Sequence, residues 1–320
     1  MSRKDIWSIT AYFNPMRYRS RLTNYRTFRS RLTLPLVTVE LAHEGTWELR
    51  DSDADLLIQI RGGDILWQKE RLLSIALAAV PASCDKIVSI DCDVIFEPPD
   101  PWQQVCEKLQ ENVLVQPFKE VFDLPAGWNG GDFAVYGADG GLSIGYAVAT
   151  GTSSTRVLTP DLSDGQRPRW LAGLAVAFRR EVFERHDFYY GRVLGGNDRA
   201  ILCAALGQYE ALAYVHHLTA RQQEHFCEWA KPFFGTARGR LGYADATIGH
   251  LWHGSIKNRN YGGRHQDLRN LEFDPYTDIA VEDNGSLRWN SDKPRLHRLA
   301  IEHFMNRRED EISSVEGAAC

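Results

Sequence analysis

The chain has 320 residues, of which 43% are hydrophobic and 25% are charged, and its formal net charge is −5. This length allows a substantial core in one large domain or two modest ones. The composition is ordinary for a soluble globular protein, and the acidic balance excludes binding to polyanions through overall charge.

Strands and helices alternate over the first hundred residues. The apolar, β-branched segments at residues 7–12, 36–41 and 54–59 predict three strands. Helices are predicted after the first strand, within residues 17–32, and from about residue 66 to 80. This alternation predicts a mostly parallel sheet with helices on both faces, whose ligands bind beyond the carboxyl ends of the strands.

The first predicted helix is rich in arginine. Six arginines and no acidic residue occur between residues 17 and 31. Aromatic and apolar residues recur every three or four positions, which predicts an amphipathic helix. The residues of its buried side are Tyr18, Leu22, Tyr25, Phe28 and Leu32. The arginines either face the phosphates of a nucleotide or nucleic acid, or are simply solvated.

Two carboxylates interrupt the apolar segment at residues 86–96. This segment is predicted to be a strand, and Asp91 and Asp93 are two positions apart in it, so their side chains project to the same side. Like charges at this spacing repel unless a cation or hydrogen-bond donors intervene. Mg²⁺ or Mn²⁺, bound by oxygen ligands, would satisfy both carboxylates and would commonly hold a diphosphate. The alternative is a solvated strand end.

Beyond residue 101 the pattern is less regular. The segments with a predicted structure are helix 102–111, strand 113–118, glycine-rich loop 127–145, apolar segment 171–178, and helices 179–185, 199–206 and 294–310. The glycine-rich loop is a candidate flexible loop for an acceptor. Asn197 or Asp198 is predicted to cap the helix that follows. No repeat and no linker divides the chain.

The cysteines and the apolar runs bear on the compartment. The six cysteines show no paired spacing, which indicates reduced thiols. No apolar run is long enough to cross a bilayer, and the first residues lack the apolar core of a signal peptide. The sequence therefore predicts a cytoplasmic protein.

A histidine pair and a basic segment occur late in the chain. His250 and His253 are three apart and can share a helical face or a turn, and imidazole joins carboxylates around borderline divalent metals. The following segment, residues 257–265, contains Lys257 and Arg264 among glycines and is suited to binding phosphates. Packed histidines and an ordinary solvated loop are the alternatives.

Asp198 follows two glycines at a predicted helix start. It can cap that helix, where the helix dipole favours its charge. It can also act as a general base, which needs only to be ionised and within hydrogen-bond reach of a hydroxyl. Because Asn197 could cap instead, both roles stay open.

Three elements in this order resemble the motifs of GT-A glycosyltransferases: Asp91-Cys92-Asp93, Gly195-Gly196-Asn197-Asp198 and His250-Leu251-Trp252-His253. Residues 170–183 are also similar to the strand and helix before the base segment in the β-1,4-galactosyltransferase group. That group has Gly-Gly-Glu-Asp-Asp and Met-x-x-His at the matching positions. Asn197 therefore replaces a Glu, Arg199 replaces an Asp, and His250 replaces the Met.

The resemblance implies a GT-A (Rossmann-like) α/β fold in a single large domain over residues 1–290, followed by a C-terminal helix and tail over 291–320. Residues 1–100 would bind the nucleotide-sugar and residues 101–290 the acceptor. It implies a metal-dependent glycosyltransferase that moves a sugar from a nucleotide-sugar, such as a UDP-sugar, to a hydroxyl with inversion. Asp198 would be the general base, and Asp91, Asp93, His250 and His253 would bind Mn²⁺ or Mg²⁺. The residues that would contact the donor are Asn14, Arg17, Arg21, Asp64, Gln68, Lys69, Asp91, Lys257 and Arg264.

Other functions fit parts of the same pattern. A nucleotidyltransferase would use the same sheet and metal, although that class carries a glycine-rich phosphate loop where this chain has residues 13–16. A non-catalytic GT-A binding module is a third alternative. The acceptor is a glycan, a protein or modified DNA. In the last case the enzyme would glycosylate hydroxymethylated bases and would have to reach them in a groove or by base flipping.

Overall fold

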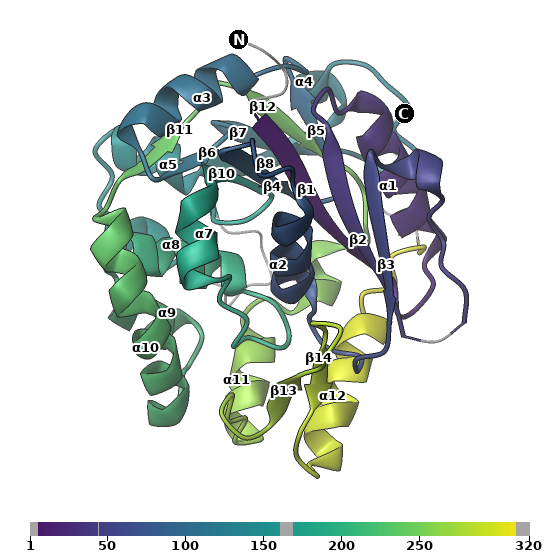
Figure 1. Ribbon diagram of the computed structural model, residues 1–320, viewed down its shortest axis with the longest axis vertical. Coiled ribbons are helices and arrows are strands. Elements are labelled where there is room, and N and C mark those ends of the chain that lie inside the picture. Colours follow the sequence, from purple (N-terminus) through teal and green to yellow (C-terminus); the bar gives the residue numbers. More distant parts are fainter. Residues whose placement is uncertain (1–5, 44, 161–168, 312–320) are drawn as a thin grey trace.

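A seven-stranded sheet forms the centre of the structure (Figure 1). The computed structural model describes residues 6–43, 45–160 and 169–311. In spatial order the strands are β3 (Leu56–Arg61), β2 (Leu36–Ala42), β1 (Ile6–Phe13), β4 (Lys86–Ile90), β10 (Ala175–Arg179), β6 (Leu114–Gln116) and β11 (Leu241–Tyr243). Six of these seven described strands run in one direction, and β10 runs antiparallel to β4 and β6. The prediction of a mixed, mostly parallel α/β sheet is confirmed.

A second sheet has five described strands. In spatial order they are β5 (Val94–Glu97), β12 (Thr247–His250), β7 (Glu120–Asp123), β8 (Ala138–Ser143) and β9 (Trp170–Leu171). The register of β12 places His250 opposite Val94 on one side and opposite Asp123 on the other. Strand pairing therefore brings His250 close to Asp93, although 156 positions of sequence separate Val94 from His250.

Helices surround the central sheet. The first six are α1 (Arg19–Arg31), α2 (Lys69–Ala79), α3 (Trp102–Glu111), α4 (Phe133–Tyr136), α5 (Ile144–Ala149) and α6 (Ser154–Leu158). The others are α7 (Arg180–His186), α8 (Asn197–Ala205), α9 (Tyr209–Val215), α10 (Ala220–Ala237), α11 (Gly263–Asn270) and α12 (Pro294–Met305). Short 3-10 helices occur at Asp51–Asp53 and Ile256–Arg259. The hairpin of β13 (Ile279–Val281) and β14 (Leu287–Trp289) lies with α11 and α12 at the lower end of Figure 1.

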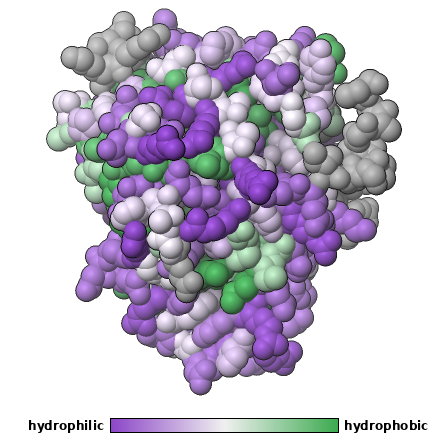
Figure 2. Space-filling view, turned by 90° about the vertical axis from the view of Figure 1, so that its right-hand side faces the viewer, coloured by the Kyte–Doolittle hydropathy of each residue, from purple (hydrophilic) through white to green (hydrophobic). Residues whose placement is uncertain are grey.

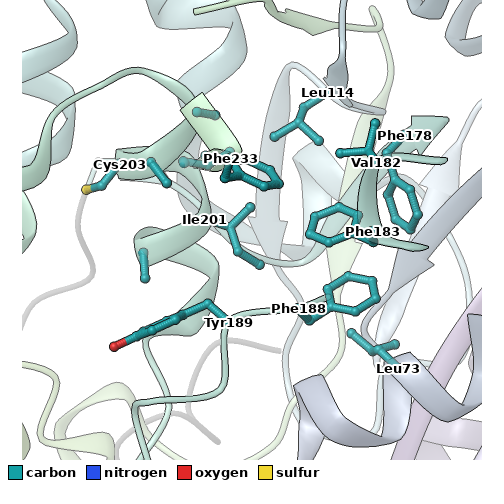
Figure 3. Packing of buried hydrophobic residues seen from close by; sticks show 14 of the residues in the cluster. Leu73, Leu114, Phe178, Val182, Phe183, Phe188, Tyr189, Ile201, Cys203 and Phe233 are labelled. Atoms are coloured by element: carbon teal, nitrogen blue, oxygen red, sulfur yellow. The ribbon is translucent and has the colours of Figure 1, made fainter. Parts of the chain in front are cut away.

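Buried apolar side chains cover both faces of the central sheet. Ile87 and Phe178 belong to the cluster that includes α2, whereas their neighbours Val88 and Ala177 belong to the cluster that includes α3. This division follows from strand geometry, because successive side chains point to opposite faces. Figure 3 shows the first cluster, in which the rings of Phe183 and Phe188 stack with centroids 4.0 Å apart.

Most predicted elements of the first hundred residues are present, but one differs in a way that shapes the site. The strand predicted over residues 86–96 is two strands, β4 and β5, which belong to different sheets. Asp91, Cys92 and Asp93 form the turn between them. The two carboxylates are therefore not on one face of a continuous strand, and each meets different neighbours.

Two further predictions need correction. The glycine-rich segment 127–145 is not one loop, because it contains α4, β8 and the start of α5. The cap of α8 is Gly196, with a φ of +100° and no side-chain cap, rather than Asn197 or Asp198. Both predicted caps lie in the first turn of the helix, so the Asp198 side chain is not engaged as an N-cap.

The arginine-rich helix is α1, and Tyr25 and Phe28 are buried as predicted. At least three of its arginines form ion pairs within the chain. The pairs are Arg21–Glu309 at 2.7 Å, Arg26–Asp53 at 3.9 Å and Arg29–Asp55 at 2.9 Å. These positive charges are therefore directed at acids of the protein itself, which weakens the case for a nucleic-acid surface on this helix.

Residues 312–320, the last part of the predicted C-terminal tail, lie outside the described residues. None of the described helices combines the length and hydrophobicity that a membrane span requires. On the face shown in Figure 2 hydrophilic side chains predominate, and the apolar ones form separate patches.

Candidate functional site

One cavity collects most of the chemistry-bearing residues. We call it the first cavity, and it is lined by the ends of β1 and β12, the turn after β4, the start of α8 and residues near the C-terminus. Asp91, Asp93, Asp198, His250 and His253 all line it. These are the residues of the three sequence motifs, and the fold brings them to one place at the carboxyl end of the sheet, as the α/β pattern predicts.

Asp93, His250 and His253 form a group with the geometry of a metal site. One ligand atom from each residue lies within 4.8 Å of the others. Asp93 Oδ1 is 3.6 Å from His250 Nε2, and Asp93 Oδ2 is 3.7 Å from His253 Nε2. These separations are too long for hydrogen bonds, so the three side chains face one another without bonding directly. The Asp93 Oδ1 atom is buried and has no hydrogen-bond partner among the described residues.

The outer nitrogens of both imidazoles are already occupied. His253 Nδ1 donates to the Leu251 carbonyl at 2.7 Å, and His250 Nδ1 lies 3.1 Å from Asp123 Oδ1. Because carbonyl and carboxylate oxygens only accept, each Nδ1 carries the proton. When the imidazoles are neutral, each Nε2 presents a lone pair toward Asp93, and when they are protonated they are cations beside it. Histidines that bind metals have this arrangement, in which a second partner fixes the tautomer and the ring orientation.

The donor set and its charge fit a divalent cation. Burial raises the pKa of the Asp93 carboxyl, but interactions with His250, Arg259 and Arg21 outweigh burial and bring that pKa down to about 2. The carboxylate is therefore ionised at neutral pH. A carboxylate with two imidazoles suits a borderline divalent ion such as Mn²⁺ better than Mg²⁺, which prefers oxygen ligands.

Asp91 belongs to a different group. Lys69 Nζ lies 2.6 Å from Asp91 Oδ1 and 2.9 Å from Asp198 Oδ1, so one buried ammonium bridges both carboxylates. Burial lowers the pKa of Lys69, but Asp198 and Asp91 more than offset burial and raise it well above its ordinary value. Burial raises the pKa of Asp91 to about 6, because the attraction of Lys69 does not fully compensate. The structure places Asp91 outside the group of metal-ligand geometry.

Asn197 and Glu70, the sequence neighbours of Asp198 and Lys69, form a buried hydrogen-bonded pair next to this group. Asn197 is fully buried, and its Nδ2 donates to Glu70 Oε2 at 2.9 Å and to the Arg192 carbonyl at 3.0 Å. Burial and the nearby Asp198 raise the pKa of Glu70 to about 8. Asn197 stands where the galactosyltransferase motif has a Glu, and here it points into the protein rather than toward an acceptor. It ties the start of α8 to α2.

Basic residues line the wall near the C-terminus. Glu309 is buried, and Arg21 donates to it from Nε at 2.7 Å and from Nη2 at 2.8 Å, while Arg307 Nε donates at 2.6 Å. Arg21 and Arg307 bring the pKa of Glu309 down to about 2 although burial opposes this shift. Arg21, predicted to contact the donor, is thus held by an acid 288 residues away in the sequence.

Two other arginines of this wall form no ion pair with any carboxylate of the described residues. Arg259 donates to the Tyr261 hydroxyl at 3.3 Å and to the His253 carbonyl at 3.0 Å. Arg264 Nε lies 3.4 Å from a ring nitrogen of His265. Both line the first cavity and are nine-tenths buried. In the described part of the chain no carboxylate lies within ion-pair distance of either, so their charge is available to an anion.

Three of the predicted donor contacts lie elsewhere. Asn14, Arg17 and Asp64 line a second cavity, at the ends of β1, β2 and β3. The alternation of β1 explains this division, because Ala11 and Phe13 line the first cavity while Tyr12 and Asn14 line the second. The two cavities therefore lie on opposite faces of this strand.

Gln68 and Lys257 line neither of these cavities. Gln68 is fully buried and hydrogen-bonds with the backbone of Leu287, to which its Nε2 donates at 2.8 Å. Lys257 belongs to the 3-10 helix at Ile256–Arg259. From this basic segment the sequence predicted Lys257 and Arg264 as donor contacts; Arg264 lines the first cavity, and Arg259 rather than Lys257 lines it with Arg264. The glycine spacing of this segment gave no sign of which arginine would face the cavity.

No protein-family model matches the sequence, and no curated protein matches it. Among solved structures, residues 1–349 of S. aureus TarS are 11% identical and align over 98% of this chain and 92% of that chain, with a TM-score of 0.35. A putative nucleotide-diphospho-sugar transferase from Desulfovibrio desulfuricans is 14% identical over 98% of this chain and 100% of that chain, with a TM-score of 0.31. A 4-diphosphocytidyl-2C-methyl-D-erythritol synthase from Anaerococcus prevotii is 11% identical over 76% and 88%, with a TM-score of 0.31. Because these TM-scores are below 0.5, the functional conclusion rests on the residues of the site.

Proposed function

We propose that the chain is a divalent-metal-dependent glycosyltransferase that moves a sugar from a nucleotide-diphosphate sugar, such as a UDP-sugar, to a hydroxyl acceptor. One observation carries this proposal. A carboxylate and two imidazoles with metal-site geometry face the same cavity as a second carboxylate, Asp198, that can accept a proton. A cation site beside a base is the arrangement that transfer to a hydroxyl requires.

Asp93, His250 and His253 would hold the metal, and Mn²⁺ fits their donor set. When bound, the ion supplies positive charge for the departing diphosphate. Arg259 and Arg264 add charge from the chain itself, and guanidinium groups bind phosphate oxygens in a planar, two-pronged geometry. Because neither forms an ion pair with a carboxylate of the described residues, both are suited to this role. Asp91, predicted as a further ligand, would serve instead to position Lys69.

Asp198 is the proposed general base. As the acceptor oxygen forms a bond to the anomeric carbon, the bond from that carbon to the diphosphate oxygen breaks, and the electron pair leaves with the diphosphate. The acceptor proton passes to Asp198. Attack from the side opposite the leaving group inverts the configuration, through a transition state with oxocarbenium character. Lys69 fixes one oxygen of Asp198, which limits the direction from which the acceptor can approach.

The donor contacts predicted for Asn14, Arg17 and Asp64 stay predictions. They would require the nucleoside to reach the second cavity around the end of β1. Spectroscopic titration of UDP against Asn14→Ala and Asp64→Ala measures their share of donor affinity directly.

UDP release from UDP-glucose and UDP-galactose in the presence of Mn²⁺ tests the proposed function. We expect turnover that EDTA abolishes and Mn²⁺ restores. His253→Ala should lose it, whereas the matched control His217→Asn, at an exposed histidine, should not. A nucleotidyltransferase would instead release pyrophosphate from UTP and a sugar 1-phosphate. Binding of a nucleotide-sugar without turnover would indicate a binding module.

A further inference from the structure

The connection between β9 and β10 has a glycine at an unexpected position. Leu174 has a φ of +78°, a conformation that favours glycine and strains a branched residue. Gly173, directly before it, is not among the residues with positive φ. The backbone conformation of this turn therefore favours glycine at position 174 and gives no reason for glycine at position 173. Gly173 needs another explanation.

Asp198 supplies that explanation. A Cβ atom added to Gly173 would lie 2.8 Å from Asp198 Oδ2, 3.2 Å from its Cγ and 3.5 Å from its Cβ. These are the three heavy atoms nearest to that position, and they all belong to one side chain. A real Cβ does not approach a carboxylate oxygen to 2.8 Å because the atoms would overlap. The missing side chain at 173 keeps the space beside Asp198 Oδ2 open.

The Asp198 carboxylate is not free to turn away from this space. Its Oδ1 is held by Lys69 Nζ at 2.9 Å, and Lys69 is itself fixed by Asp91 at 2.6 Å. The turn is anchored to the same place, because the Leu174 carbonyl accepts a hydrogen bond from the Asp91 amide at 2.7 Å. One oxygen of Asp198 therefore points at the ammonium and the other at the bare backbone of Gly173.

We infer that Gly173 determines where the acceptor hydroxyl meets the base. The hydroxyl reaches Asp198 Oδ2 across the uncovered Cα of Gly173, while the contact of Lys69 with Oδ1 fixes the direction of Oδ2. This inference rests on the proposed function and deepens it. The segment that carries Gly173 lines the cavity with the uncharged residues 171–174, and Lys69 and Arg199 line the same cavity.

Gly173→Ala tests the inference through turnover. With Mn²⁺ and UDP-galactose or UDP-glucose, we expect UDP release to fall about 100-fold, the effect of displacing a catalytic group by about 1 Å. Affinity for UDP and Mn²⁺ should stay within about twofold of wild type. The matched control is Gly235→Ala in α10, where an added Cβ meets nothing within 4 Å. Turnover of Gly173→Ala equal to that of the control would overturn the inference.

A double-mutant cycle tests the same contact without activity. We expect Gly173→Ala to lower the melting temperature in the wild-type background and to leave it unchanged in Asp198→Ala, because the overlapping atoms are then gone. An equal loss in both backgrounds, or none in either, would overturn the inference. If the wild-type protein released no UDP from any nucleotide-sugar, the proposed function would fail, while this cycle would still decide whether Gly173 makes room for Asp198.

Discussion

The two carboxylates of one turn, Asp91 and Asp93, enter different surroundings. Asp93 faces two imidazoles and has a buried oxygen that no described residue hydrogen-bonds, whereas Asp91 is paired with Lys69 at 2.6 Å. One acid has a cation built into the chain, and the other has the geometry to receive one from solution. Two acids at this spacing therefore need not share an ion, because a turn between them can direct each to its own partner.

This difference separates the two halves of the proposed chemistry. The Asp93 group would hold the cation that faces the departing diphosphate. The Lys69 group, through Asp198, would handle the acceptor proton. A variant in one group should therefore disturb one of these functions and leave the other in place.

Asp93→Ala should have the largest effect on activity. Loss of a direct ligand should cost more than the 10- to 100-fold typical of an outer-sphere partner, so we expect at least a 100-fold fall in Mn²⁺-dependent UDP release. The side chain is not part of an apolar cluster, so the melting temperature should change little. Turnover near the wild-type level would break the comparison by removing Asp93 from the metal site.

Lys69→Met should have the largest effect on stability. It leaves Asp91 and Asp198 close together without their shared cation, and loss of one partner of a buried ionic group costs about 3 kcal/mol. Urea unfolding measures the loss. Lys69→Arg, which keeps the charge, should recover part of it. Mn²⁺ affinity should persist in folded Lys69→Met, and its disappearance would show that the two groups are not separate.

Asp123→Asn should have a smaller, specific effect on the metal group. The amide oxygen can still accept from His250 Nδ1, but without the charge that makes the imidazole a better ligand. We expect Mn²⁺ affinity to fall about tenfold by calorimetric titration. Asp85→Asn, at an exposed carboxylate paired with Lys86, is the matched control. Equal affinities in the two variants would contradict the role of Asp123.

Glu70→Gln should act mainly on the pH dependence of stability rather than on activity or metal affinity. The pKa of Glu70 is raised from 4.5 to about 8, so the folded protein binds a proton that the unfolded chain releases at lower pH. Wild-type stability should therefore fall as pH rises through this window. Glutamine does not ionise, so the free energy of unfolding of Glu70→Gln relative to wild type should increase from about pH 5 to pH 8. A difference that is constant over this range would contradict the assignment.

Local patterns of the sequence predicted the fold class and singled out Asp93, His250 and His253, which the fold brings together, along with Asp91, which it pairs with Lys69 instead. The β–α alternation of the first hundred residues is visible because each element has its own periodicity. The break between β4 and β5 is not, since Ile90 and Val94 flank the turn with β-branched residues that continue the strand pattern. Only pairing of β5 with β12, in a second sheet, defines that break.

The sequence does not reveal the partners of the site residues, because these partners are far apart along the chain. Lys69 meets Asp198 across 129 positions, and Arg21 meets Glu309 across 288. No periodicity or spacing reports contacts at such separations. The same holds for Gly173, since a glycine that spares room for a distant carboxylate looks, in sequence, like any glycine in a turn.

The cation site is the central claim, and anomalous X-ray diffraction tests it most directly. Crystals of the wild-type protein grown with MnCl₂ and UDP should give a peak at the manganese edge between Asp93 and the Nε2 atoms of His250 and His253, and crystals of His253→Ala should lose it. A peak at Asp91 and Asp198 instead, or no peak in this cavity, would contradict the account.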